Sequence, residues 1–559
     1  MQTILLLLPL LYASSAIAGT ATGTGAKSLS AAALSSRERV LPASVLQAVD
    51  KNLSWKAAAW RGERVSGQLA VRSEAGSREL ALKATPLQGP GGVRLPLKVA
   101  RVQATRAKEQ AIPDVIGGGS GKQGLQPGSA ETIWFSADVP QGAPAGIYRG
   151  EVLASARGAA PVRCPVELRV LPATLPPPPA WSAHIDFWQY PMAVARWHKV
   201  PAWSAKHFAL MEPLMKRLAD AGQKAITCTL IDEAWNGQTY DDCPSMIGWE
   251  RRADGRMKYD YKHFDQWVEF MTDVVGIRGQ ITCYTMLPWS SSIRVFDRRS
   301  GQYEKIPVKP GEASYEAIWG DFLDDFRRHV ARKGWTERIY IGIDERSDAQ
   351  VKALCDVLKK HAPEFKIASA VDRPTTTSAL IDDLSIALPH AGSALDGTLE
   401  KRRAEGKKTT FYVCVYPLRP NTFTASDPAE GEWLGIYAAA KRFDGILRWA
   451  WNAWNENPFE KTDFGNWPAG DCFLVYPGNL TSIRFEVLRD GIEEFEKIRL
   501  LREKAGAADA PEALREAVGR MNDVLEEVSG GAPSGEADYR GRVEKARAAV
   551  EKASEVLAD

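Results

Sequence analysis

Between residues 182 and 452, short apolar runs alternate eight times with longer amphipathic segments. The predicted strands are Ser182–Trp188, Ala225–Ile231, Gln280–Leu287, Arg338–Glu345, Lys366–Val371, Leu384–His390, Thr410–Tyr416 and Gly445–Asn452. The predicted helices include His207–Ala221, His263–Val275, Tyr315–Lys333, Ala349–His361 and Leu434–Phe443. Strands that alternate with helices pair in parallel through right-handed crossovers. Eight such units in about 300 residues favour a closed (β/α)₈ TIM barrel. An open doubly wound sheet is the alternative, but no glycine-rich nucleotide-binding turn follows the first strand.

Regions of different character flank the predicted barrel, which we place at residues 180–480. Residues 30–175 contain short alternating runs separated by Gly and Pro, a pattern typical of a β-sandwich. Its predicted strands include Gly67–Val71, Val93–Val99, Thr132–Ala137, Tyr148–Ala154 and Val162–Val170. Consecutive prolines in Leu175–Ala180 predict a stiff spacer. Residues 481–559 predict helices over Ser482–Ala505, Pro511–Glu527 and Asp538–Leu557. We expect the sandwich to buttress the barrel rather than to bind glycan.

The first 18 residues predict export. Met1–Ala18 is an apolar run that ends in small residues with an A-x-A cleavage pattern, which is typical of a signal peptide. Its apolar core of about ten residues is short of the roughly 20 that a membrane span needs. We therefore expect a cleaved signal peptide, a secreted or periplasmic protein, and no membrane span.

Composition excludes several functional classes. A formal net charge of +2 supplies no basic excess for binding nucleic acid. The seven cysteines contain no C-x-x-C pair, and the seven histidines show no metal-ligand spacing. No metal or cofactor is therefore expected. The chain does carry 18 tryptophans, which either pack in cores or stack on flat ligands such as sugar rings.

Candidate site residues follow from the barrel prediction, because barrel active sites lie at the C-terminal ends of the strands. Carboxylates ringed by aromatic side chains suit a sugar site, since acids transfer protons and flat rings stack on the C–H face of a pyranose. The predicted substrate-binding residues are Trp188, Tyr190, Asp232, Glu233, Tyr284, Trp289, His390, Tyr416, Trp449, Trp451 and Asn452. For His390, a hydrogen-bonded core histidine is an equally good interpretation.

The run Ile339–Glu345 ends abruptly in two adjacent carboxylates, Asp344 and Glu345. Ideal strand geometry aims only one of two successive side chains into a barrel, so both can reach a substrate only if the backbone turns. The competing interpretation is structural, with Asp344 capping the next helix and Glu345 pairing with Arg346. Asp232 and Glu233 repeat the pattern on the second predicted strand and form a rival pair.

Four stretches carry a resemblance to a known family. They are Val139–Gly150 (VPQGAPAGIYRG), Gly342–Glu345 (GIDE), Gly445–Asn452 (GILRWAWN) together with Gly470–Gly478 (GDCFLVYPG), and Ser482–Glu494 (SIRFEVLRDGIEE). On these the chain resembles glycoside hydrolase family 123, the exo-acting β-N-acetylgalactosaminidases. Arg346 follows the acidic pair where a proline is common in that family.

The resemblance implies a substrate-assisted retaining mechanism without a metal, an exception to the usual two-carboxylate scheme. The 2-acetamido oxygen of the substrate would attack C1 and form an oxazolinium ion. Asp344 would orient and stabilise the acetamido nitrogen. Glu345 would protonate the leaving oxygen and then activate water, and apolar surroundings would favour its protonated form.

Two other functions remain open on the sequence alone. One is a glycosidase that acts on a sugar without an acetamido group and uses Glu345 with Asp232 or Glu233. The other is a non-catalytic carbohydrate-binding barrel. In every case the expected partner is a glycan or glycoconjugate.

Overall fold

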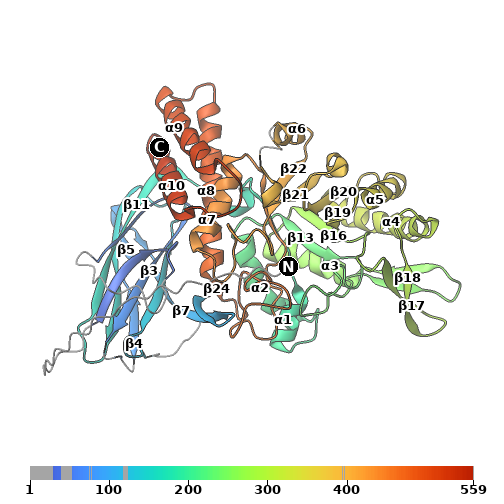
Figure 1. Ribbon diagram of the computed structural model, residues 1–559, viewed down its shortest axis with the longest axis horizontal. Coiled ribbons are helices and arrows are strands. Elements are labelled where there is room, and N and C mark those ends of the chain that lie inside the picture. The colour runs from blue at the N-terminus through green and yellow to red at the C-terminus, as the bar shows by residue number, and fades with distance from the viewer. Residues whose placement is uncertain are drawn as a thin grey trace, which may run out of the picture.

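The computed structural model describes residues 29–39, 53–74, 76, 79–117, 124–392, 395 and 397–557. A sheet-rich N-terminal region lies beside a central barrel, and the C-terminal helices pack between the two (Figure 1). The predicted signal peptide falls outside the described residues. Within the described part, no helix combines the length and the apolar character that a bilayer crossing requires.

Eight parallel strands form the barrel in the order β12-β23-β22-β21-β20-β19-β16-β13. Their bounds are β12 His184–Phe187, β13 Ala225–Thr229, β16 Gln280–Tyr284, β19 Ile339–Asp344, β20 Lys366–Val371, β21 Asp383–Ala387, β22 Lys408–Tyr412 and β23 Gly445–Arg448. The ring is nearly closed by a single parallel bridge between Ile185 and Gln223. There the amide of Lys224 donates to the carbonyl of Ile185 at 2.8 Å. The prediction of eight parallel strands is therefore confirmed.

The connections between strands depart from a regular (β/α)₈ pattern. The α-helices of the connections are α1 Pro191–His198 and α2 Ala205–Ala219 after β12, α3 Lys262–Glu269 with the π-helix η3 Phe270–Val275 after β13, α4 Ala313–Lys333 after β16, α5 Asp348–His361 after β19, α6 Thr398–Ala404 after β21 and α7 Pro428–Ala440 after β22. Between β20 and β21 the structure has only the 3₁₀ helix η5, Thr376–Leu380, because the short connection leaves no room for a covering α-helix. The regular pattern that we predicted is thus not reproduced at this crossover.

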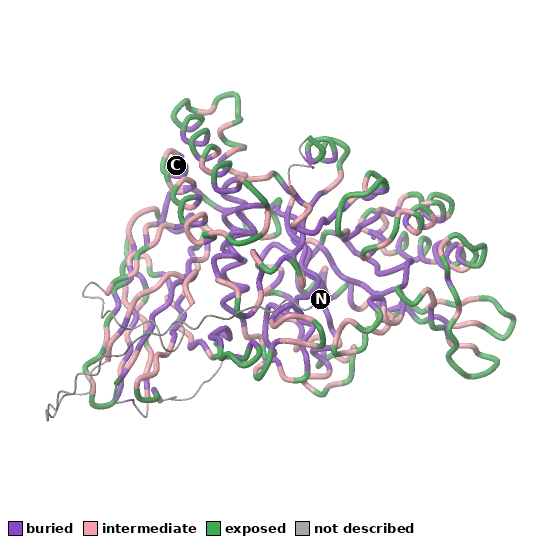
Figure 2. Tube along the Cα trace, viewed as in Figure 1, coloured by how far each residue is buried: buried purple, intermediate pink, exposed green. Residues whose placement is uncertain are grey.

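A small antiparallel-rich sheet, which the sequence did not predict, is inserted at the C-terminal end of the barrel. Its order is β15-β14-β17-β18. The bounds are β14 Gly248–Arg251, β15 Met257–Asp260, β17 Ser292–Asp297 and β18 Gln302–Pro307. The β17–β18 hairpin projects from the barrel at the right of Figure 1, and its tip is exposed in Figure 2. The insertion lengthens the connections after β13 and β16, the strands that flank one side of the acidic pair.

The N-terminal region contains two sheets, ordered β1-β3-β9-β7-β8-β24 and β2-β11-β10-β5-β6, with β4 paired to β10. The strands are β1 Leu29–Ser35, β2 Trp55–Arg61, β3 Arg64–Ser73, β4 Leu80–Ala84, β5 Leu87–Gln88, β6 Arg94–Leu95, β7 Lys98–Ala107, β8 Gln110–Ile116, β9 Ala130–Asp138, β10 Gly146–Ala156, β11 Val162–Thr174 and β24 Thr481–Ser482. Leu69 and Phe135 of the first sheet share one apolar cluster with Tyr148 and Leu168 of the second. Burial of these side chains stabilises the region.

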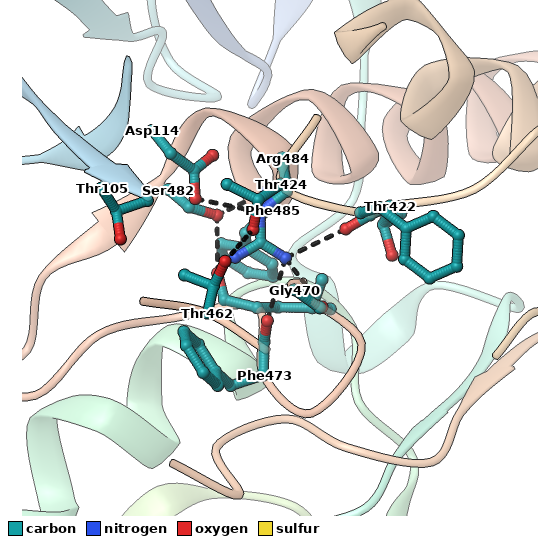
Figure 3. Close-up of polar contacts among 12 residues, drawn as sticks. Thr105, Asp114, Thr422, Thr424, Thr462, Gly470, Phe473, Ser482, Arg484 and Phe485 are labelled. Carbon is teal, nitrogen blue, oxygen red and sulfur yellow. Dashed lines mark hydrogen bonds and ion pairs between the residues drawn. The ribbon is translucent and has the colours of Figure 1, made fainter. Parts of the chain in front are cut away.

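The C-terminal helices are α8 Ile483–Gly506, α9 Glu512–Ser529 and α10 Tyr539–Glu555. The chain enters α8 through β24, which pairs with β8 of the N-terminal region. In the first turn of α8, Arg484 lies at the junction of three parts of the molecule (Figure 3). Its Nε donates to Asp114 Oδ2 of β8 at 3.0 Å. Its Nη1 donates to the carbonyls of Thr422, Gly470 and Phe473 at 2.9–3.0 Å. One buried ion pair therefore joins the N-terminal sheet to α8, and the same guanidinium holds the loops after β22 and β23.

Other buried ion pairs join the C-terminal helices to the N-terminal region, to α7 and to one another. Lys497 of α8 lies 3.0 Å from Glu63 of the N-terminal region. Arg547 of α10 lies 2.8 Å from Glu432 of α7 and 3.0 Å from Glu494 of α8. Since an unpaired buried charge is strongly destabilising, the Lys497–Glu63 pair favours one position of α8 on the N-terminal region, and the Arg547 pairs favour one packing of α10 on α7 and α8.

Candidate active site

The acidic pair stands where β19 leaves the barrel. Asp344, the last residue of the strand, is half-buried, whereas Glu345 is exposed. The backbone turns into the left-handed region at Glu345 (φ 48°) while its amide still donates to the carbonyl of Ala370 at 3.0 Å. This conformation is uncommon outside glycine. The turn that both carboxylates need in order to face a ligand is therefore present.

The two carboxyl groups have different partners on opposite sides. Trp289 Nε1, from the connection after β16, donates to Asp344 Oδ2 at 3.4 Å. Tyr412 Oη, at the end of β22, donates to Glu345 Oε1 at 2.6 Å. Since β16 is next to β19 while β22 lies three strands away on the other side, the partners of the pair come from both sides of the barrel mouth. In each carboxyl group one oxygen is not engaged by these bonds.

Asp344 and Glu345 differ in how far they are removed from solvent. Burial, followed by the charge of Glu345, raises the pKa of Asp344 to about 6. The charge of Arg346 and the bond from Trp289 act in the opposite direction. We expected apolar surroundings to act on Glu345, but its side chain reaches solvent and the desolvation falls on Asp344 instead.

Arg346 takes a defined position beside the pair. Its guanidinium lies 3.7 Å from the centroid of the Trp289 ring, and its Nε donates to the carbonyl of Leu287 at 2.8 Å. Helix α5 is capped by Ser347 in a capping box with Gln350, so Asp344 is not the helix cap.

Arg346→Gln is expected to move the acidic limb of the pH–kcat/KM profile to higher pH. Without the nearby positive charge, the already raised pKa of Asp344 rises further, so its ionised form appears only nearer neutral pH. A pH–rate profile on an aryl glycoside checks this. Arg373→Gln is the control, because Arg373 is exposed and pairs with its neighbour Asp372. A shift of the same size in both variants, or a shift toward acid, would contradict the assignment.

Asp232 and Glu233, the rival pair, are hydrogen-bonded mainly within the loop that follows β13. Glu233 also has a left-handed backbone (φ 52°), but its carboxylate accepts the amides of Cys243 at 2.7 Å and Gly237 at 3.0 Å. Asp232 accepts the amide of Ser245 at 2.7 Å and Arg294 Nη1 at 3.3 Å. Three of these four bonds close the loop after β13, and both oxygens of each carboxylate are occupied.

Four of the predicted aromatic residues form a buried cluster at the barrel mouth. The ring centroids of Trp188 and Tyr284 are 4.7 Å apart, and those of Tyr190 and Trp449 are 6.3 Å apart. Burial raises the pKa of Tyr190 and Tyr284, and the Asp344 carboxylate contributes to both shifts. Trp235 bridges the two pairs at 5.3 Å from Trp188 and 5.6 Å from Tyr190. The cluster therefore lies close to Asp344.

Trp451 and Asn452 lie deeper. Trp451 is fully buried and its ring packs 4.7 Å from that of Phe485 in α8. Asn452 is also buried and clamps the backbone of Tyr190, accepting its amide and donating to its carbonyl, each at 3.0 Å. These two residues support the aromatic cluster rather than line the opening.

Three predicted residues are accessible to a ligand. Trp289 is 42% and Tyr416 is 58% exposed. His390 has a half-exposed side chain whose Nε2 lies 3.5 Å from Asp372 Oδ1, so it is not a core histidine. In the described part of the chain, no group of three or more His, Cys, Asp and Glu side chains could hold a metal ion.

Sequence reasoning missed Tyr412 and Asp471. We placed the seventh strand end at Tyr416, but β22 ends at Tyr412, four residues earlier. Asp471 Oδ2 accepts Trp449 Nε1 at 3.1 Å and Asp471 Oδ1 accepts Arg448 Nη1 at 2.8 Å, which fixes the Trp449 ring. No sequence pattern marks Asp471, because it lies 22 residues after Trp449, in a loop that folds back onto the end of β23.

The comparisons with known proteins agree on one family. The family model for the catalytic domain of glycoside hydrolase 123 matches residues 188–501. A family 123 glycoside hydrolase from Clostridium perfringens, described in terms of glycolipid glycan hydrolysis, is 27% identical with a TM-score of 0.85, over 94% of this chain and 98% of that one. A GH5 xyloglucanase from Bacteroides ovatus is 10% identical with a TM-score of 0.30, over 79% and 98%, which is too low to support an inference. The search of curated proteins found no match.

Proposed function

Because the chain belongs to glycoside hydrolase family 123, we propose that it is an exo-acting β-N-acetylgalactosaminidase with a substrate-assisted, retaining mechanism. The observation that carries the proposal is the acidic pair at the end of β19. Trp289 bonds to Asp344 Oδ2 and Tyr412 bonds to Glu345 Oε1, so each of the two adjacent carboxyl groups keeps one oxygen for a ligand. A substrate-assisted reaction needs two such groups on one side of the sugar, one for the acetamido N–H and one for the leaving oxygen.

In the first step, the acetamido oxygen of the substrate attacks C1 and the glycosidic bond breaks. Glu345 donates its proton to the leaving oxygen, and a cyclic oxazolinium ion forms. Tyr412 occupies Oε1 of Glu345, which leaves Oε2 for the leaving group. Ionised Asp344 accepts the acetamido N–H through Oδ1, since Trp289 lies on Oδ2, and its charge stabilises the cation.

In the second step, Glu345, now a carboxylate, removes a proton from water. The water oxygen bonds to C1, the ring of the oxazolinium ion opens, and the acetamido group is restored with retention of configuration. No protein nucleophile is needed. This agrees with the engagement of Asp232 and Glu233 in the loop after β13, which leaves neither acid poised as a second catalytic carboxylate.

A panel of 4-methylumbelliferyl glycosides tests the reaction and the sugar together. We expect turnover of the 2-acetamido galactoside, less of its gluco epimer, and none of the 2-hydroxy galactoside. Successive fluorination of the acetamido methyl group should lower kcat steeply, because it withdraws electrons from the attacking oxygen. Turnover of the 2-hydroxy sugar, or a rate indifferent to fluorination, would favour the alternative glycosidase with a protein nucleophile. No turnover of any member would favour a carbohydrate-binding barrel.

We further propose that the protein is exported and that its substrate is the terminal residue of a glycolipid glycan. The predicted signal peptide at residues 1–18 supports export, and the relative from Clostridium perfringens supports the substrate class. Amino-terminal sequencing of the secreted or periplasmic protein should begin at Gly19. Mass spectrometry of the sugar released from a glycolipid checks the substrate, and we expect free N-acetylgalactosamine. Release of a larger oligosaccharide would contradict exo action.

A further inference from the structure

A cavity of about 410 Å³ lies at the end of the barrel opposite the acidic pair. It is lined by Ser182, just before β12, and Asp444, just before β23, which places it at the N-terminal ends of these strands. Arginines from three elements also line it: Arg403 of α6, Arg442 after α7, and Arg499 and Arg502 of α8. We call this site the arginine cavity. Four guanidinium groups thus face one carboxylate among the lining residues.

That carboxylate is fully engaged. Asp444 Oδ1 accepts Arg403 Nε at 2.9 Å, and Oδ2 accepts the amide of Thr409 at 2.7 Å. Arg499 is paired outside the lining, with Glu496 at 2.9 Å and Glu503 at 2.6 Å. Two of the four positive charges are therefore compensated by protein acids.

Arg442 and Arg502 are not compensated. Arg502 donates only to neutral acceptors, the carbonyl of Ala439 at 2.6 Å and Asn522 Oδ1 at 2.8 Å. Neither arginine has a carboxylate within 4 Å in the part of the chain that the structure describes. Burial, followed by the charge of Arg442, lowers the pKa of Arg502 to about 10, as expected for like charges that face a shared cavity.

Hydrogen bonds hold the backbone of Arg442 in place. Its backbone is left-handed (φ 59°), and its carbonyl accepts Arg403 Nη2 at 2.6 Å. The same Arg403 is anchored by Asp444. The left-handed turn ends helix α7, where the amide of Phe443 donates to the carbonyl of Ala438 at 2.9 Å, and the bond from Arg403 fixes the backbone of the exposed Arg442 at the rim of the cavity.

We propose that the arginine cavity binds a tetrahedral oxyanion, a phosphate or sulfate group, with Arg442 and Arg502 as its principal ligands. Guanidinium groups match such oxyanions through paired N–H donors. The volume is that of a small-molecule site. Phe443 and Phe495, which also line the cavity, provide apolar contact for an organic substituent. The group could come as the free ion or as an ester, and Phe443 and Phe495 favour the ester.

Isothermal calorimetry at fixed ionic strength tests the proposal, with inorganic phosphate, inorganic sulfate, phenyl phosphate and phenyl sulfate as probes. We expect saturable binding that Arg442→Gln and Arg502→Gln each weaken by about tenfold or more. Arg520→Gln is the matched control, since Arg520 lies on α9, is 70% exposed and is absent from the lining. Tighter binding of the phenyl esters identifies an ester ligand, and equal binding identifies a free ion.

Absence of saturable binding for every probe would overturn the proposal. So would equal weakening by Arg442→Gln and Arg520→Gln, which would indicate only general charge attraction. Melting temperatures show whether each variant is folded; Arg442 is exposed, so its variant provides the test even if Arg502→Gln unfolds. Binding is read without glycosidase turnover, so this result is independent of the proposed reaction.

Discussion

Glu345→Gln is expected to lower kcat/KM for a β-N-acetylgalactosaminide with a poor leaving group by about 10²–10⁴-fold. Glutamine cannot donate a proton to the leaving oxygen or accept one from water. The loss of kcat for the first step should shrink for a 2,4-dinitrophenyl glycoside, because that leaving group departs without protonation. Stopped-flow release of the phenol measures this step. The melting temperature should change little, since Glu345 is exposed.

Glu233→Gln is the matched control for that substitution. Glu233 has the same sequence context and a similar backbone conformation, but its carboxylate binds the amides of Cys243 and Gly237. The variant should keep most of its activity and lose some thermal stability. If Glu233→Gln were inactive and Glu345→Gln active, the assignment of the acid would be wrong.

Asp344→Asn is expected to lose about 10²–10³-fold in kcat with every leaving group and to gain stability at neutral pH. Activity falls because a neutral amide cannot stabilise the oxazolinium cation. Stability rises because the pKa of Asp344 in the folded state, about 6, lies above the usual value of about 3.9. Above pH 6 the folded protein must hold an unfavourable charge there; for a half-buried group, its removal should add about 1–2 kcal/mol to the free energy of unfolding.

The extra stability of Asp344→Asn should appear as pH rises from 4 to 7. It should vanish below pH 4, where Asp344 of the wild type is protonated in both the folded and the unfolded protein. Urea denaturation at pH 4 and pH 7.5 measures it. Asp348→Asn is the control with the opposite sign, because hydroxyls of Thr375, Thr376 and Thr377 hold the pKa of Asp348 below its usual range. That variant should lose stability at pH 7.5 and remain active. An Asp344→Asn protein no more stable than the wild type at pH 7.5 would contradict the desolvated carboxylate.

The strands of the barrel could be predicted because strands buried on both faces read as continuous apolar runs. Predicted and observed bounds coincide for β20, Lys366–Val371, and differ by only one residue at each end for β19. The acidic pair was found for the same reason, since a carboxylate directly after such a run stands out. The small sheet of β14, β15, β17 and β18 was missed because its polar, turn-rich hairpins resemble long loops.

The sequence could not show which aromatic residues at the barrel mouth lie near Asp344 and which pack elsewhere. Trp449 and Trp451 sit two residues apart after the same strand, yet the first belongs to the cluster near Asp344 and the second packs on α8. In a regular strand, two residues that are two positions apart point to the same face. Trp451 differs from Trp449 because α8, more than 30 residues later in the chain, packs against it. Tyr412 was missed because an apolar run gives no sign of where pairing stops, and Val413 continues the run beyond β22.

The ion pair between Asp114 and Arg484 bears on how chimeras of this enzyme can be made. The region that matches the catalytic family model, residues 188–501, contains the arginine but not the aspartate. An N-terminal region transplanted from another protein would leave a buried guanidinium without its carboxylate, at a cost of about 3–5 kcal/mol. The N-terminal region and the catalytic region can therefore be exchanged between relatives only together. The exception is an N-terminal region that itself carries an acid on the strand that pairs with Thr481–Ser482.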